Sequence, residues 1–307
     1  MSQALTPTVC AVIVTFKRQE LLRACLTAVL SQTRSPDAVL VVDNHSQDGT
    51  LEMLRAEFPT VEVLALPDNR GGAGGFHAGM RHAYALGYDF LWVMDDDGCA
   101  DACCLEHLYH AAQGEPGVYG AVCVRPDDPT KLSFPAPLGD EFSAQTRQLN
   151  ALEGAMDKRR VLRGWAAFMN AILFPRDVIE RAGLPRAEMF IWGDEVEYAK
   201  RIKASGIPIF TVFDARHVHP PDRIVWQSAL RPDWQVYAGP LDWKSFCFFR
   251  NAGLLARHYG RGKGASMLAR YFYFYLVQRR GDWGALQFFL RAYRAGWRGD
   301  FARRVPF

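Results

Sequence analysis

Residues 90–97 read Phe-Leu-Trp-Val-Met-Asp-Asp-Asp, a short apolar run that ends in three consecutive carboxylates. Such a run is typical of a strand buried on both faces of a parallel sheet. Apolar runs that end in polar residues also occur at 9–18 and 38–44, and the segment between them, 19–30, has apolar residues at helical spacing. We therefore expect strands and helices to alternate from residue 9 onward.

The expected elements continue this alternation along the chain. Strands are expected at residues 9–15, 38–42, 61–66, 90–94, 118–124 and 207–213. Helices are expected at 19–30, 48–58, from 76 to about 86, and at 101–113, 194–205, 244–259, 266–279 and 283–296, while 161–174 is β-rich and 125–160 gives no clear signal. Strand–helix repetition predicts a doubly wound, mostly parallel α/β sheet. We expect this α/β domain over residues 1–243 and a helical C-terminal extension over 244–307.

Charge is divided unevenly between these two parts. Residues 244–307 contain 13 Lys and Arg against two Asp, a charge of +11, and the whole chain is only +3, which leaves −8 for residues 1–243. A basic, aromatic tail on an acidic body favours contact with anionic lipid or nucleic acid. No apolar stretch approaches the roughly 20 residues of a membrane span, and the first residues lack a basic signal-peptide start. We therefore expect a cytoplasmic protein.

The acidic triplet at the end of the 90–94 strand predicts a metal site. In extended chain, residues i and i+2 point the same way, so Asp95 and Asp97 face one cation together. Adjacent carboxylates repel each other unless a cation or base neutralises them. Mg²⁺ or Mn²⁺ carrying a diphosphate is the natural partner. The alternative is a solvated acidic turn.

Further polar signals fall at the carboxyl ends of the expected strands, where open parallel sheets bind ligands. Asp43 follows Val-Leu-Val-Val, and its carboxylate is placed to accept the imide N–H of a uracil or thymine ring. The alternative is that Asp43 and Asn44 cap the next helix.

A glycine-rich turn at residues 69–75 follows the third expected strand. It lacks the Gly-Lys-Ser/Thr ending of a P-loop and fits the dinucleotide-binding pattern poorly, which argues against an ATPase and a dinucleotide-dependent dehydrogenase. Its glycines allow close approach of a ligand to the backbone at a helix N-terminus.

A second acidic cluster occurs at Asp194-Glu195, where a helix is expected to begin. A carboxylate there is suited to deprotonate a sugar hydroxyl as general base. The alternative is the ordinary enrichment of acids in a first helical turn. His217 and His219 follow the 207–213 strand, and either one is suited to complete the metal site.

In order along the chain, these motifs resemble those of the family 2 inverting glycosyltransferases, which have a GT-A fold. The matching stretches are residues 14–18, 41–50, 69–79, 94–97, 190–198 and 215–220. The 69–76 loop and the Trp-Gly-Asp-Glu-Val-Glu-Tyr stretch are similar to the branch of bacterial rhamnosyl- and galactofuranosyltransferases, as is Phe-Phe-Arg-Asn at 248–251.

The resemblance implies a role for each matching residue. The donor nucleotide and its sugar would contact Thr15, Arg18, Asp43, Asn69, Gly71, Gly72, Gly74 and Asp96. A divalent cation, Mn²⁺ or Mg²⁺, would bind Asp95, Asp97 and His219, with His217 in reserve. The general base would be Glu195, with Asp194 as the other candidate.

Together these features predict a metal-dependent inverting glycosyltransferase. Its donor would be a UDP- or dTDP-linked sugar, and its acceptor a saccharide, lipid-linked, in cell-surface polysaccharide synthesis. The tail would attach the enzyme peripherally to the anionic inner face of the plasma membrane rather than to nucleic acid; the alternative is that its aromatic residues pack as a core. Trp165 and Trp192 would stack on acceptor sugars or pack internally. A sugar-phosphate nucleotidyltransferase and a non-catalytic sugar-nucleotide-binding subunit remain the alternatives.

Overall fold

The computed structural model describes residues 6–138, 144–221 and 224–301. They form two compact units. The first comprises Met1–Ala187 and Arg201–Asp222, and the second comprises Glu188–Lys200 and Arg223–Phe307. The second unit therefore begins earlier in the chain than the helical extension expected at 244–307.

A sheet forms the centre of the first unit. Its strands are β1 (Val9–Thr15), β2 (Ala38–Asp43), β3 (Glu62–Ala65), β4 (Phe90–Asp95), β5 (Cys99–Ala100), β6 (Val118–Val124), β10 (Ile172–Pro175) and β11 (Ile209–Val218), in the order β3-β2-β1-β4-β10-β6-β11-β5. The flanking helices are α1 (Gln19–Leu30), α2 (Thr50–Glu57), α3 (Gly71–Ala85), α4 (Cys104–Ala112) and α6 (Arg176–Ala182). Strands β1 to β4 are mutually parallel, as are β6 and β11. The predicted mostly parallel α/β sheet is confirmed.

Two parts of the sheet differ from expectation. The β-rich stretch 161–174 supplies β9 (Val161–Arg163) and β10, and β10 runs antiparallel between β4 and β6. The stretch without a clear signal supplies β7 (Lys131–Leu138), β8 (Ala144–Gln148) and the short helix α5 (Leu149–Gly154).

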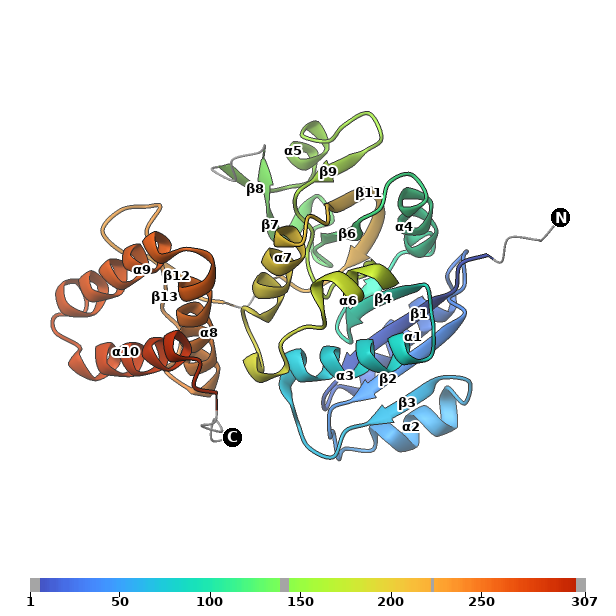
Figure 1. The fold of residues 1–307 in the computed structure, drawn as a ribbon, viewed down its shortest axis with the longest axis horizontal. Helices are drawn as coiled ribbons and strands as arrows, with labels where there is room; N and C mark the ends of the chain where they lie inside the picture. Colours follow the sequence, from blue (N-terminus) through green and yellow to red (C-terminus); the bar gives the residue numbers. More distant parts are fainter. Residues whose placement is uncertain (1–5, 139–143, 222–223, 302–307) are drawn as a thin grey trace. The chain divides into compact units, whose positions relative to one another are not determined.

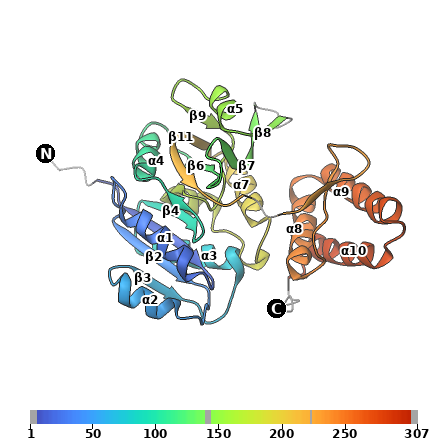
Figure 2. The ribbon, with the colours of Figure 1, turned by 180° about the vertical axis from the view of Figure 1, so that it is seen from behind.

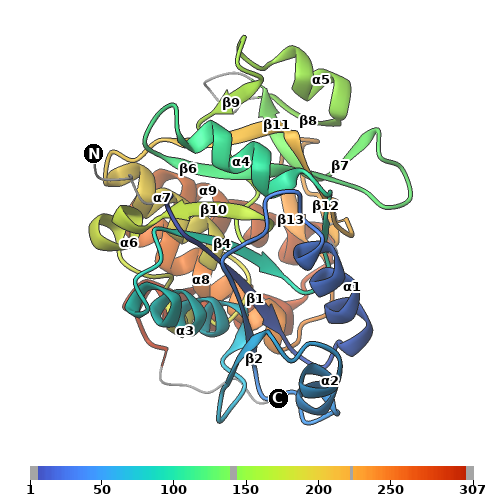
Figure 3. The same ribbon diagram turned by 90° about the vertical axis from the view of Figure 1, so that its right-hand side faces the viewer.

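Helices cover both faces of the sheet (Figures 1 and 2). Figure 3 shows α3 and α6 on one side of it and α1 and α2 on the other. Strand β1 explains why both faces must be apolar. Val9, Ala11 and Ile13 belong to the core cluster that contains the buried side chains of α1, α2 and α4. Val12 and Val14 face α3 instead, since alternate side chains of a strand point to opposite faces.

Glycines let α3 lie close to the sheet. A Cβ at Gly79 would come within 2.6 Å of both Val12 and Val42, and one at Gly75 would meet Val14. The helix already begins at Gly71, so the turn expected at 69–75 is shorter than the sequence indicated, and most of its glycines are helical.

The second unit contains a small hairpin and the C-terminal helices. Its elements are β12 (Trp226–Ser228), β13 (Gln235–Tyr237), α8 (Trp243–Tyr259), α9 (Arg261–Tyr273), a π-helical turn (Phe274–Gln278) and α10 (Trp283–Arg298). Helix α7 (Asp194–Ala204) begins in this unit, after the 3₁₀ turn Ala187–Met189. The helices expected at 244–259, 266–279 and 283–296 are thus present with small shifts at their ends.

Aromatic side chains form the core of the second unit. Phe249, Tyr271 and Phe289 are buried and lie in mutual ring contact, with centroids 4.4–5.2 Å apart. Tyr275 and Tyr293 are buried in the same cluster. These five side chains are therefore packed internally, as the alternative of an aromatic core in the tail predicts.

Helices α8 and α10 cross at two glycines. A Cβ at Gly296 would overlap the carbonyl oxygen of Arg250, and one at Gly253 would overlap that of Tyr293.

Within the part of the chain that the structure describes, no helix combines the length and hydropathy needed to cross a bilayer.

Candidate active site

The structure brings three of the predicted metal ligands together in the first unit. Asp95 is the last residue of β4, Asp97 follows it, and His219 comes directly after β11. Ligand atoms of these three side chains all lie within 4.8 Å of one another. The ends of two strands that are distant in sequence therefore converge on one cluster.

The cluster suits a divalent cation. The ring Nδ1 of His219 lies 2.6 Å from the carbonyl oxygen of Pro220, which can only accept, so Nδ1 carries a proton. The other nitrogen, Nε2, lies 3.0 Å from Asp97 Oδ1. With its proton on Nδ1, a neutral ring would present the lone pair of Nε2 to a cation bound by the carboxylates. Two carboxylates and one imidazole are also an acceptable donor set for Mn²⁺, and carboxylates are preferred by Mg²⁺.

His217, the reserve ligand, is not part of this cluster. Its ring is fully buried, 6.1 Å from that of His219 between centroids, and neither of its nitrogens has a hydrogen-bond partner among the described residues. It packs against Gly98, where a Cβ would overlap its Nε2. Burial, with the nearby His219, lowers the pKa of His217 to about 3, so its ring is neutral. Of the two histidines, the structure places only His219 with the carboxylates.

Arg18 and Thr15 contact the acidic triplet directly. Arg18 Nη1 donates to Asp96 Oδ1 at 2.9 Å and to Asp97 Oδ2 at 3.0 Å, and Thr15 Oγ1 donates to Asp96 Oδ2 at 2.7 Å. Burial raises the pKa of Asp96, and the charge of Arg18 opposes that rise. The positive charge of Arg18 therefore offsets the repulsion between these adjacent carboxylates.

Asp43 lies beside Thr15 in the register of β1 and β2, so it belongs to the same edge of the sheet. Its carboxylate accepts from the backbone N–H of Ser46 at 3.3 Å, a contact within the turn that follows β2, whereas α2 has Gly49 as its N-cap and no side-chain cap. The neighbouring Asn44 has a contact that the sequence did not predict. It donates to Gly71 O and accepts from Arg70 N, and so ties the end of β2 to the start of α3.

The glycine-rich segment also lies at this edge. Asn69 Oδ1 accepts from Gly71 N at 2.8 Å. Gly71 and Gly74 are buried, and a Cβ at Gly74 would overlap the side chain of Arg70. Gly72 is partly exposed, with only ordinary contact around it, and is the glycine most open to an approaching ligand.

The acidic pair belongs to the second unit. Asp194 is the first residue of α7 and is buried, and Glu195 is partly exposed. Glu195 Oε2 accepts from Gly193 N at 3.0 Å. Trp192 packs in the same unit with Tyr237 and Phe248, at centroid distances of 6.1 and 6.4 Å, which supports its packing interpretation.

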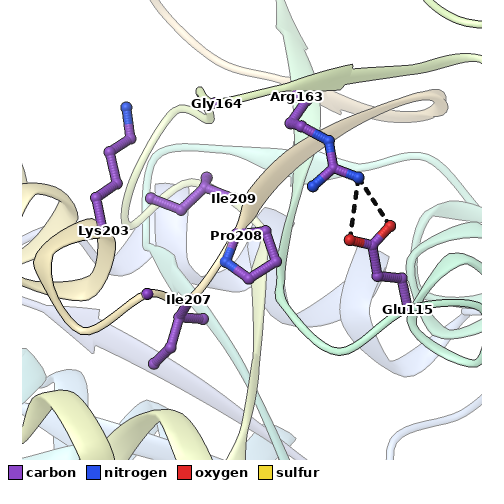
Figure 4. A pocket seen from close by; sticks show the side chains of 8 residues that line it. Glu115, Arg163, Gly164, Lys203, Ile207, Pro208 and Ile209 are labelled. Carbon is purple, nitrogen blue, oxygen red and sulfur yellow. Dashed lines mark hydrogen bonds and ion pairs between the residues drawn. The ribbon is translucent and has the colours of Figure 1, made fainter.

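A separate cavity of about 510 Å³ lies in the first unit (Figure 4). Its lining includes Ile207, Pro208 and Ile209 at the start of β11, together with Arg163 and Glu115, which form an ion pair at 2.9 Å. It therefore lies at the opposite end of β11 from His219 and is not the site of the predicted ligands.

Comparison with known proteins agrees with this fold. The model of glycosyl transferase family 2 matches residues 10–166. The galactofuranosyltransferase GlfT1 of Mycolicibacterium smegmatis is 35% identical over 306 residues, covering 97% of this chain and 99% of that protein. GlfT1 of Mycobacterium tuberculosis H37Rv is 34% identical over 308 residues, covering 97% and 98%.

Two solved structures share the fold at low identity. GalNAc-T7, crystallised with UDP, GalNAc and Mn²⁺, has a TM-score of 0.56 at 16% identity, covering 80% of this chain and 48% of its own. TarS of S. aureus has a TM-score of 0.52 at 14% identity, covering 87% and 44%. This chain thus spans about half the length of each. With the GT-A-type sheet and the Asp-Asp-His cluster in place, these matches identify the chain as a member of glycosyltransferase family 2 and as a glycosyltransferase.

Proposed function

We propose that this enzyme transfers galactofuranose from a nucleoside-diphosphate donor to a saccharide acceptor with inversion. The observation that carries the proposal is the convergence of Asp95, Asp97 and His219 within 4.8 Å at the carboxyl end of the sheet. A donor of this class brings a diphosphate whose charge requires a cation, and Mn²⁺ or Mg²⁺ suits this donor set. The choice of sugar comes from the relatives named galactofuranosyltransferase.

The nucleotide is assigned to the edge formed by β1 and β2. Asp43 would accept the imide N–H, and Gly72 offers a backbone that the donor can approach. Uracil and thymine share that imide, so a UDP- and a dTDP-linked donor fit equally. Thr15 and Arg18 would act through Asp96, which they hold by hydrogen bonds, and Asp96 would face the donor sugar.

The transfer step is assigned to the acidic pair. Glu195 accepts the proton of the acceptor hydroxyl while the hydroxyl oxygen bonds to the anomeric carbon from the face opposite the diphosphate. The bond from that carbon to the diphosphate breaks, and the nucleoside diphosphate leaves with the electron pair. Asp95, Asp97 and His219 would hold a divalent cation, which would supply positive charge that offsets the charge of this leaving group.

The acceptor is proposed to be lipid-linked, with the enzyme on the anionic inner face of the plasma membrane. The turn between α9 and α10 supports this. Val277 and Trp283 are 59% and 62% exposed there, beside the exposed Arg279 and Arg280. Exposed aromatic residues with arginines suit the headgroup level of a bilayer.

A donor assay tests the proposed function. The purified enzyme is incubated in Mn²⁺ with UDP-galactofuranose, UDP-galactopyranose or a dTDP-sugar, with and without a saccharide acceptor. We expect release of free nucleoside diphosphate from the galactofuranosyl donor, stimulation by acceptor, and loss of activity with EDTA. Release from none of the donors, or equal release with and without metal, contradicts the proposal.

A further inference from the structure

The loop that precedes α7 has a strained backbone. Phe190 and Trp192 have φ of 68° and 60°, in the left-handed region, and Gly193 follows at 96°. Residues other than glycine adopt this region at a cost in free energy and keep it only where the surroundings hold them. This loop leads directly into Asp194 and Glu195, so whatever holds it also places the acidic pair.

A buried side chain of α8 supplies that hold. Asn251 Nδ2 donates to the carbonyl oxygens of Met189 at 2.9 Å, Ile191 at 3.0 Å and Trp192 at 2.8 Å. Asn251 is fully buried. Because a carbonyl removed from water needs a donor and these three carbonyls lie outside the helices and strands, the single amide satisfies three main-chain groups of the loop.

Arg250 also binds the loop and orients the side chain of Asn251. We call Arg250 and Asn251 together the clamp. Arg250 is buried, and its Nη2 donates to Met189 O at 2.9 Å and to Glu188 O at 3.3 Å. Its Nε donates to Asn251 Oδ1 at 3.3 Å. Because the amide oxygen of Asn251 faces this guanidinium, the amide NH₂ group must face the loop carbonyls.

The clamp is connected to the acidic pair through Gly193. The backbone N–H of Gly193 donates to Glu195 Oε2, and its carbonyl accepts from Glu197 N at 2.9 Å in the first turn of α7. The same helix α8 also reaches Glu197, because Tyr259 Oη donates to Glu197 Oε1 at 3.0 Å. Helix α8 therefore fixes both the loop and the first turn that carries the carboxylates.

We propose that Arg250 and Asn251 are positioning residues of the transfer reaction, holding the 188–193 loop so that the carboxylate of Glu195 meets the acceptor hydroxyl. This rests on the proposed role of the acidic pair. Both side chains are buried and act on the main chain of the loop, so the proposal gives them no direct contact with substrate. A displacement of about 1 Å at a reacting group costs on the order of 100-fold in rate.

The decisive variant is Asn251→Asp. It keeps the size of the side chain and replaces the NH₂ donor by an oxygen that repels the three loop carbonyls. We expect kcat for transfer to fall about 100-fold, while the donor KM and the Mn²⁺-dependent affinity for nucleoside diphosphate stay close to the wild-type values. Amide hydrogen exchange in the 189–197 segment should become faster.

Two further variants separate positioning from stability. Ser245→Ala breaks the capping box with Asp242 at the start of α8, and among the described residues the hydrogen bonds of Ser245 go to Asp242 rather than to the loop, so it should lower Tm and leave kcat and loop exchange unchanged. Arg250→Lys keeps the charge but loses the planar guanidinium, which donates both to the loop and to Asn251. Its kcat should therefore lie between those of the wild type and Asn251→Asp.

Each result bears on the proposal. The proposal is overturned if Asn251→Asp keeps the kcat and the loop hydrogen exchange of the wild type. It is also overturned if Ser245→Ala lowers Tm as much as Asn251→Asp does and loses as much kcat. If the wild-type enzyme transfers no sugar, the proposed function fails. The claim that Asn251 holds the loop is tested separately, because unchanged hydrogen exchange of the loop in Asn251→Asp would refute it.

Discussion

The carboxylates of the two units are placed by different kinds of contact. In the first unit, Asp95 is paired with Val14 in the register of β4 and β1, and His219 follows the last residue of β11. In the second unit, Asp194 and Glu195 follow a loop of left-handed residues that is held by side chains of α8.

The difference determines how each group responds to substitution. A strand end is fixed by the whole ladder of main-chain hydrogen bonds, and one side chain changes its position little. A loop that depends on one or two side chains moves when either is lost. Substitutions at the strand ends should therefore remove only the group replaced, whereas substitutions around the loop should act at a distance.

The largest effect is expected at Glu195. Glu195→Gln keeps the shape of the side chain but removes the proton acceptor, so transfer should fall about 10²–10⁴-fold. Binding of nucleoside diphosphate, measured by calorimetry in Mn²⁺, should be retained. If Glu195→Gln transfers normally and Asp194→Asn does not, the base is Asp194.

The next largest effect is expected at the strand-end cluster. Asp97→Ala should abolish Mn²⁺-dependent binding of nucleoside diphosphate, because loss of a ligand exceeds the roughly 10–100-fold cost of losing an outer-shell partner. Circular dichroism and Tm should stay near wild type, since the site is at a strand end rather than in the core. Undiminished binding of the nucleotide in Mn²⁺ would refute the site.

Glycine substitutions compare the packing of the two units. At Gly79 an added Cβ meets side-chain methyl groups of Val12 and Val42, which can shift, whereas at Gly296 it meets the backbone of α8. Overpacking costs about 1–3 kcal/mol, so we expect Gly79→Ala near the lower end and Gly296→Ala at or above the upper end. Urea unfolding measures both. Gly262→Ala on α9 has open space and serves as the control; a greater loss at Gly79 than at Gly296 would contradict this comparison.

The smallest effect is expected at the α9–α10 turn. Each basic residue near an anionic bilayer contributes about 1 kcal/mol, so Arg279→Gln and Arg280→Gln should each weaken binding to phosphatidylglycerol vesicles about fivefold in a flotation assay, and Trp283→Ser should weaken it further. Binding should fall as salt rises. If the full-length enzyme does not bind these vesicles at low salt, the α9–α10 turn is not a membrane-binding surface.

The sequence predicts the strand-end site better than the loop. Asp95 and Asp97 follow an apolar run whose length and composition already predict a buried strand. His217 and His219 are two residues apart, and only the structure shows that β11 ends between them, at Val218. Short antiparallel strands such as β10 carry too few residues for a periodic signal.

The contacts of Arg250 and Asn251 have no local signal at all. They reach main-chain groups about 60 positions earlier, and nothing in the spacing of either segment indicates the pairing. The positive φ values of Phe190 and Trp192 are equally hidden, because neither residue type favours them.

The order of the strands has a consequence for synthesis of the protein. Strand β11 pairs with β6, which precedes it by about 90 residues, and β10 lies between β6 and β4 in the same sheet. On the ribosome, the two carboxylates therefore emerge more than 100 residues before the histidine that joins them. Because pairing between distant strands is slow, we expect the Asp-Asp-His cluster to be completed late in folding, so that a metal ion bound there could not assist the earlier steps.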